Sequence, residues 1–453
     1  MTKTRILWFI VLPGLSMWLG WGIRGLVGHS TGAMIPGAFA ALALSILLPS
    51  KQFSRALAIA LTAVGFGYGA DMTTLQSAGL ATGYFHNFPN AALLGYSGLI
   101  IKGALWALFG GTGLGLALTA SRYRRKDILL GLTFFVTSFF AGWALINRSK
   151  VLYFSVDRHE TWAGLLFGAV VLLTWLTVRG KTHIPLIIAL SVAAAGAVGY
   201  PIAVTINGWG RHHHPGIWYD WWKVAETTYG FFMGAGLGIG TYLIKGQLPE
   251  ARESKETVAG GGFSIWAIVL GVALAVLCKM LYEKDLAWIW LGTVLLIASF
   301  YSEKIAWHVG VTLTYFACAW DVMLHNWLRN QHIGNAAVLW ALAILATLVV
   351  SWKVTTLWNR TDKAMVRSAY LFLMWSILIL TYLMIFVNHT LLYPSAEGIA
   401  AAGGWWTYTA QGWGADSVVE VFFTIAAIGL TWIVYRVSTL QGSSEGVTSS
   451  RTS

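Results

Sequence analysis

Long apolar runs separated by short polar segments dominate the chain. A membrane-spanning helix needs about 20 mostly apolar residues, and about fourteen stretches approach that description. The pattern therefore predicts an all-α, polytopic membrane bundle. The predicted spans are residues 5–23, 33–48, 55–70, 91–120, 128–146, 162–178, 184–206, 224–244, 263–281, 286–300, 305–324, 336–357, 366–387 and 417–435.

These runs form one transmembrane domain over residues 1–440, and the Ser-, Gly- and Thr-rich residues 441–453 are predicted to be a disordered tail. Fourteen spans divide into seven plus seven, and an odd number per half would invert the second half, as in many transporters. The best internal match, LGWGIRGLVG against FMGAGLGIG, is short and rich in glycine. The sequence thus leaves an inverted repeat as a weakly supported alternative to an unrepeated bundle.

Composition supports the membrane assignment. Hydrophobic residues make up 57% of the chain and charged residues 11%, whereas soluble proteins carry about 25% charged residues. The net charge of +12 indicates basic cytoplasmic loops rather than nucleic-acid binding. Neither a GxxxxGK[ST] loop, a GxGxxG turn nor a GxSxG elbow is present, so no cofactor is predicted. Cys278 and Cys318 lie in apolar runs and suggest neither a disulfide nor a metal site.

The basic residues also predict an orientation. With the N-terminus inside and strict alternation of the spans, roughly 20 of the 30 Lys and Arg residues fall on the cytoplasmic side. The run from Arg122 to Lys126 is the densest group. The first apolar run lacks a clear cleavage site and is predicted to be retained. Both termini are then cytoplasmic, and a bacterial inner membrane is the expected location.

The opposite face has a different composition. Nine of the 11 His residues fall there, together with most acids and many Trp residues. An aromatic belt at the membrane interface explains part of this enrichment. The loops 207–223 and 390–416 are denser in these residues than a belt requires, so the outer face is predicted to carry the function.

Residues 18–37, WLGWGIRGLVGHSTGAMIPG, combine glycines with two polar side chains. The glycines predict that the first helix is interrupted near Arg24, and that a new helix begins near His29. A helix N-terminus beside an arginine forms an anion site, with His29 placed to bind or transfer a proton. Alternatively, Arg24 extends to the interface and His29 caps a loop.

Residues 65–90 contain glycines at a helix end followed by Asp71 and a polar, weakly charged segment. This composition predicts a glycine-broken, re-entrant or interfacial stretch. Asp71 could pair with Arg24 or Lys102, or could lie solvated at a frayed helix end.

Lys102 lies within a long apolar run. A lysine in a membrane helix costs about 2.5–3.5 kcal/mol on insertion scales, so it is expected to pair inward. Glu226 and Glu420, each about one turn inside a predicted outer helix end, are the candidate partners. Extension of the lysine to the interface is the alternative.

Residues 207–226 contain the run His212-His213-His214 and an aromatic cluster. Adjacent loop histidines rarely converge on one ion, and no accompanying motif supports a metal site. Trp218 and Asp220 could instead stack on a sugar ring and accept hydrogen bonds from its hydroxyls. An interfacial aromatic helix is the alternative.

Two pairs of polar residues have i, i+4 spacing, which places them on one helix face. Asp321 could orient His325 as a general base, or the two could form a polar helix end. Asp416 and Glu420 could act as acid and base or bind a cation, although acids are also favourable at a helix N-terminus.

Two functional hypotheses of different classes follow. The first is a secondary transporter, without enzymatic activity, for a small polar or anionic metabolite such as a sugar or sugar acid, with a site opening to the outer face. The second is a membrane-embedded glycosyl- or acyltransferase at that face, and a structural subunit of a membrane complex is a further alternative. The expected partners are the lipid bilayer and a small-molecule substrate, without nucleic acid, and oligomerisation stays open. The candidate site residues are Arg24, His29, Asp71, Lys102, Trp218, Asp220, Glu226, Asp321, His325 and Glu420.

Overall fold

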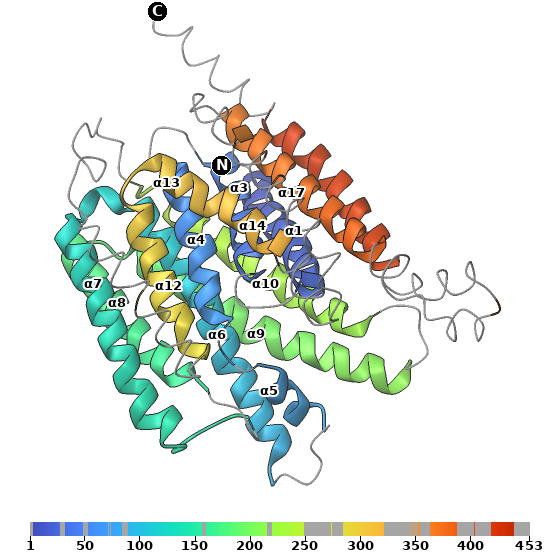
Figure 1. Ribbon diagram of the computed structural model, residues 1–453, viewed down its shortest axis with the longest axis horizontal. Coiled ribbons are helices and arrows are strands. Elements are labelled where there is room, and N and C mark those ends of the chain that lie inside the picture. Colours follow the sequence, from blue (N-terminus) through green and yellow to red (C-terminus); the bar gives the residue numbers. More distant parts are fainter. Residues whose placement is uncertain are drawn as a thin grey trace, which may run out of the picture.

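The computed structural model describes residues 3–27, 32–48, 53–70, 72, 74–83, 89–155, 160–214, 220–248, 273, 284–320, 345, 349, 352–353, 363–386, 403 and 418–438. Within these ranges all regular structure is helical (Figure 1). The helices are α1 (Lys3–Val27), α3 (Met34–Leu47), α4 (Arg55–Gly69), α5 (Thr74–Ala81), α6 (Ala91–Leu118), α7 (Arg125–Gly142), α8 (Trp162–Gly180), α9 (Ile184–His213), α10 (Trp221–Ile244), α12 (Lys284–Ser299), α13 (Glu303–Trp307), α14 (Leu313–Trp320) and α17 (Lys363–Phe386). The 3-10 helix η1 (Ala120–Arg122) and the π-helices η2 (Trp143–Arg148) and η3 (His308–Thr312) are short, and a last helix covers Val418–Ser438.

Seven helices in the described part are long and apolar enough to cross a membrane. This supports a multi-pass membrane protein, while fourteen spans and an inverted repeat stay predictions. The predicted spans 263–281 and 336–357 lie almost entirely outside the described residues. Helices α3, α4 and α12, which fall on predicted spans, have 14, 15 and 16 residues and are shorter than a usual span.

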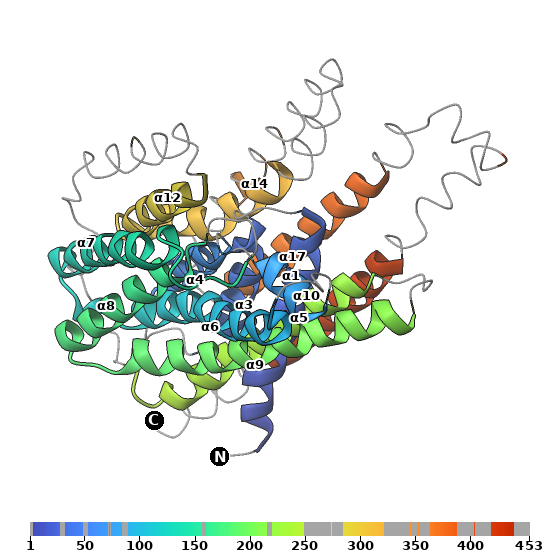
Figure 2. The ribbon, with the colours of Figure 1, turned by 90° about the horizontal axis from the view of Figure 1, so that it is seen from below.

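A ring of packed helices forms the centre of the molecule. Helix α1 packs on α3, α3 on α4, α4 on α6, α6 on α9, α9 on α10, and α10 returns to α1. Every residue of α3 and α4 is buried, which explains why both helices are apolar on all sides. The α7–α8 hairpin lies beside α6, α12 covers α4, and α17 packs on α3 (Figures 1 and 2).

Glycines set the close approach of neighbouring helices. On α10, Gly230, Gly234 and Gly238 recur every fourth residue and face the backbone of α1. A Cβ atom at Gly234 would collide with the Pro13 carbonyl oxygen, and one at Gly238 with the Phe9 carbonyl oxygen. Small residues at this spacing let two helices pack backbone to backbone in a membrane.

The first helix ends three residues beyond Arg24, and the glycines on either side of Arg24 do not interrupt it. Helix α1 continues through Gly20, Gly22 and Gly25 and ends at Val27. These glycines provide room for neighbours instead: a Cβ at Gly20 would lie 2.6 Å from the Pro36 Cα atom of α3. In the second predicted irregular stretch, 65–90, α4 ends at Gly69 and the short helix α5 packs against α6.

Candidate functional site

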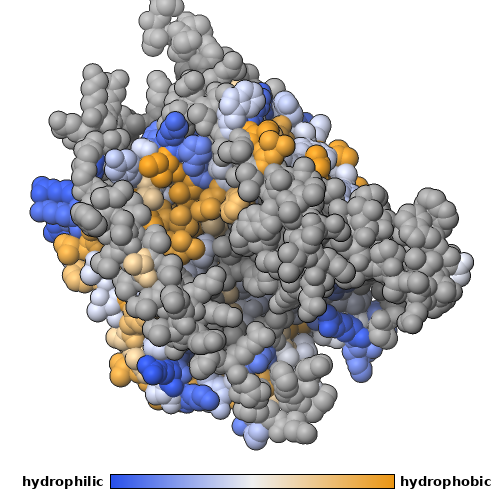
Figure 3. Space-filling model, in the orientation of Figure 1, coloured by the Kyte–Doolittle hydropathy of each residue, from blue (hydrophilic) through white to orange (hydrophobic). Residues whose placement is uncertain are grey.

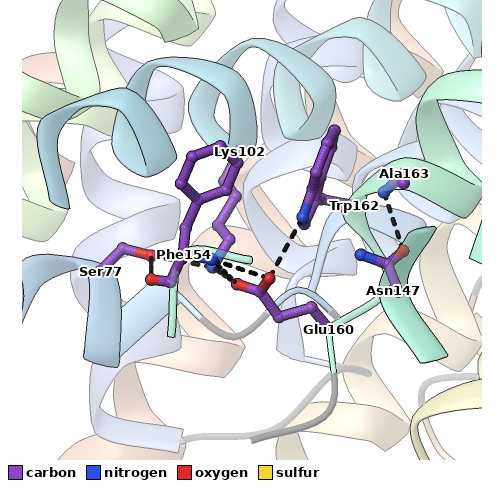
Figure 4. Close-up of polar contacts among 7 residues, drawn as sticks. All are labelled: Ser77, Lys102, Asn147, Phe154, Glu160, Trp162 and Ala163. Carbon is purple, nitrogen blue, oxygen red and sulfur yellow. Dashed lines mark hydrogen bonds and ion pairs between the residues drawn. The ribbon is translucent and has the colours of Figure 1, made fainter. Parts of the chain in front are cut away.

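Lys102 is buried on α6 within a dense polar network (Figure 4). Its ammonium group donates to Glu160 Oε1 at 2.6 Å and to Ser77 Oγ at 2.8 Å. The sequence pointed to Glu226 or Glu420 as its partner, and this is wrong, because Glu160 comes from the segment that precedes α8. Both members of the pair are almost completely excluded from solvent.

The remaining acceptors of this network are also used. The Phe154 backbone N–H donates to both Glu160 oxygens, at 3.1 and 2.9 Å, and Trp162 Nε1 donates to Oε2 at 3.2 Å. Ser77 Oγ donates to the Phe154 carbonyl at 2.7 Å. The network, hereafter the Lys102 network (Ser77, Lys102, Phe154, Glu160 and Trp162), therefore joins α5, α6 and the segment leading into α8. Its satisfied hydrogen bonds indicate a structural role, because they offset the cost of burying both charges.

A second group of charges lies where α1 meets α10. Glu226 Oε2 accepts a hydrogen bond from Lys223 Nζ at 2.9 Å, and Glu226 Oε1 lies 3.7 Å from Arg24 Nη1. The side chains of Lys223 and Glu226 are 7% and 3% exposed, and that of Arg24 is 19% exposed. We call Arg24, Lys223 and Glu226 the Arg24 cluster. Two cations share one carboxylate, so the cluster carries one excess positive charge.

Two indole rings lie beside the guanidinium group of Arg24, and two tyrosine rings pack against this group of rings. Its Cζ atom lies 5.4 Å from the centroid of Trp21 and 5.9 Å from that of Trp106. Tyr229 packs edge-on against Trp21, with 4.8 Å between centroids, and Tyr200 lies at the same distance from Tyr229. These rings come from α1, α6, α9 and α10, so the cluster lies where four helices of the central ring converge.

Two buried donors beside the cluster have no hydrogen-bond partner. They are Arg24 Nε and Trp21 Nε1, one turn apart on α1. Buried donors in folded proteins are nearly always paired with protein or with ordered water, so these two donors are available to water or to an acceptor oxygen. The excess charge and these donors together fit an anion that bears more than one acceptor oxygen.

Tight packing holds Glu226 against α1. A Cβ atom at Gly25 would overlap the Glu226 carboxylate and come close to Lys223 Nζ. Gly25 therefore brings the α1 backbone into contact with the carboxylate. The sequence drew attention to Arg24 and Glu226 separately, but Lys223 was missed because a lysine near a helix start is typical of any interfacial segment.

Of the other predicted site residues, Asp220 and Glu420 lie within the described part of the chain. Asp220 caps α10, where its Oδ1 accepts a hydrogen bond from the Trp222 backbone at 2.8 Å. Glu420 is fully buried on the last helix, and one turn later Phe423 contacts Gly22 of α1. His29, Asp71, Trp218, Asp321 and His325 lie outside the described residues.

No protein-family model, curated protein or solved structure matches the chain.

Proposed function

We propose that the protein is a secondary transporter for a small organic anion, and that the Arg24 cluster binds the carboxylate of that substrate. The observation that carries the proposal is the largely buried, net-positive cluster beside a group of aromatic rings that four helices contribute. Transporter sites commonly lie inside a helical bundle and use a few ionised groups.

The substrate class follows from the charge count. One carboxylate added to two cations and Glu226 brings the net charge of the buried site to zero. A singly charged acid is therefore favoured over a dianion, which would leave an uncompensated buried charge. The fork of the guanidinium group suits bidentate carboxylate binding, and Trp21 Nε1 is placed to donate a further hydrogen bond.

The aromatic rings suggest the rest of the ligand. Flat rings beside polar groups stack on the C–H faces of sugars and on other apolar surfaces. A sugar acid meets both requirements, since it combines one carboxylate with a polyhydroxylated carbon chain.

The test is ligand-induced thermal stabilisation of the purified protein in detergent, with gluconate and glucuronate as probes and glucose as the uncharged comparison. We expect both acids, and not glucose, to raise the melting temperature. Arg24→Gln removes a charge-assisted hydrogen bond of about 1.5–3 kcal/mol, so affinity for the acids falls roughly 10- to 150-fold.

Glu226→Gln changes affinity in the opposite direction. Glu226 competes with the substrate for both cations and repels its carboxylate by at least about 1 kcal/mol at 4 Å, the value for full screening by water. The variant should therefore melt at a lower temperature when empty yet bind the acids about fivefold more tightly. Weaker binding in both variants, or no acid-dependent stabilisation of the wild type, would reject the site.

A further inference from the structure

A second group of basic residues lies on the turns that join α6 to α7 and α8 to α9. Arg122, Arg124 and Lys126 are exposed around the start of α7, and Lys181 is exposed where α8 ends. These four cations form no ion pair with any acid in the described part of the chain. We call them the α7–α8 basic patch.

Buried hydrogen bonds hold the two turns together. Tyr123 Oη donates to the Leu176 carbonyl at 3.0 Å, and Trp175 Nε1 donates to the Asp127 carbonyl at 2.7 Å. Tyr123 is only 4% exposed, so this contact is part of the core. The cations are therefore displayed on a fixed surface rather than on independent loops.

The acid nearest to the patch is already neutralised. Arg179 donates from Nη2 and Nε to Asp127 Oδ1 at 2.6 and 3.0 Å, and the Arg124 backbone N–H donates to Oδ2 at 3.1 Å. Because Asp127 is committed to these contacts, the positive field of the patch is not compensated locally.

Exposed apolar side chains begin next to the patch. Leu130 and Phe134 are 44% and 39% exposed on α7, and Val178 is 65% exposed on α8. In Figure 3, hydrophilic and hydrophobic surface lie side by side at the left edge, over the region where Figure 1 shows α7 and α8. Cations at the edge of an apolar helix surface lie at the depth of lipid headgroups.

We propose that the α7–α8 basic patch binds the phosphate headgroup of an anionic phospholipid. The fixed spacing of the cations and the adjoining apolar surface favour a lipid over a soluble anion, because the acyl chains can lie along α7 and α8 while the phosphate contacts the cations.

The experiment measures lipid binding to the purified full-length protein by native mass spectrometry, with phosphatidylglycerol compared to phosphatidylcholine of the same acyl chains. The test variant is Arg124→Gln with Lys181→Gln. The control is Arg148→Gln with Lys150→Gln, which removes the same charge from exposed positions at the opposite end of α7.

We expect the wild type to prefer phosphatidylglycerol. Each cation near an anionic lipid surface contributes about fivefold to affinity, so the test variant should lose about 30-fold and the control less than about twofold. Glycerol phosphate, which has the charged group without acyl chains, should not displace the lipid at equal concentration. Equal losses in both variants, no preference in the wild type, or displacement by glycerol phosphate would overturn the proposal.

Discussion

At the scale of single residues, Lys102 and Arg24 meet their carboxylate partners in physically different ways. Lys102 has Glu160 and Ser77 at hydrogen-bond distance, and Glu160 is in turn held by backbone and indole donors. Arg24 lies at 3.7 Å from its carboxylate and keeps a buried Nε without a partner. Saturated networks stabilise a fold, whereas an incompletely satisfied cation can bind an anion.

The Lys102 network gives a stability prediction. Lys102→Met should destabilise the protein by about 3–5 kcal/mol, because it leaves the Glu160 carboxylate buried without its counter-charge. Combining it with Glu160→Gln should recover a large part of that loss, since no buried charge is then left. The measurement is the thermal unfolding of the two single variants and the double variant in detergent.

If the loss of stability in the double variant equalled the sum of the losses in the two single variants, the pairing of Lys102 with Glu160 would be contradicted. Gluconate and glucuronate should still raise the melting temperature of the double variant, because the Lys102 network contributes no group to the proposed binding site.

At the scale of helices, the hydrophobic pattern located elements well. The predicted spans 55–70 and 91–120 correspond to α4 (Arg55–Gly69) and α6 (Ala91–Leu118), because apolar runs of this length leave few alternatives. The glycines around Arg24 were predicted to interrupt the first helix, but α1 runs through them to Val27 and uses them for contact with other helices. Sequence spacing gives no information about which helix supplies a neighbour, and this is why Glu160 was missed as the partner of Lys102.

The close contact between α1 and α10 predicts that replacing a glycine there with a larger residue destabilises the protein. Gly234→Leu should force α10 away from α1, because the added side chain would collide with the Pro13 backbone. Overpacking of this kind costs roughly 1–3 kcal/mol or more. Since the same two helices carry Arg24 and Glu226, stabilisation by gluconate should also decrease.

The matched control is Gly429→Leu on the last helix, where an added Cβ meets nothing within 4 Å. Unfolding temperature and gluconate-dependent stabilisation report the two effects. If Gly429→Leu were as damaging as Gly234→Leu, the loss would come from the leucine itself and not from the α1–α10 contact.

At the scale of the whole molecule, the described helices form a ring in which α1, α6, α9 and α10 meet around the Arg24 cluster. Composition was sufficient to predict a helical membrane protein, because 57% hydrophobic residues in long runs fit little else. The proposed substrate site required the fold, since its residues come from positions 21 to 229. His29, Trp218 and His325, which the sequence predicts to be at the outer face, lie outside the described residues, and their roles stay predictions.

The most direct test of the transport claim is uptake of radiolabelled gluconate and glucuronate into proteoliposomes. We predict uptake above that of protein-free liposomes for the wild type, and a decrease of about tenfold or more for Arg24→Gln, because the charge-assisted contact with the carboxylate is lost. Arg211→Gln, at an exposed position near the end of α9, should keep wild-type rates. Uptake that is absent in the wild type, or that is the same in wild type and Arg24→Gln, would contradict the account.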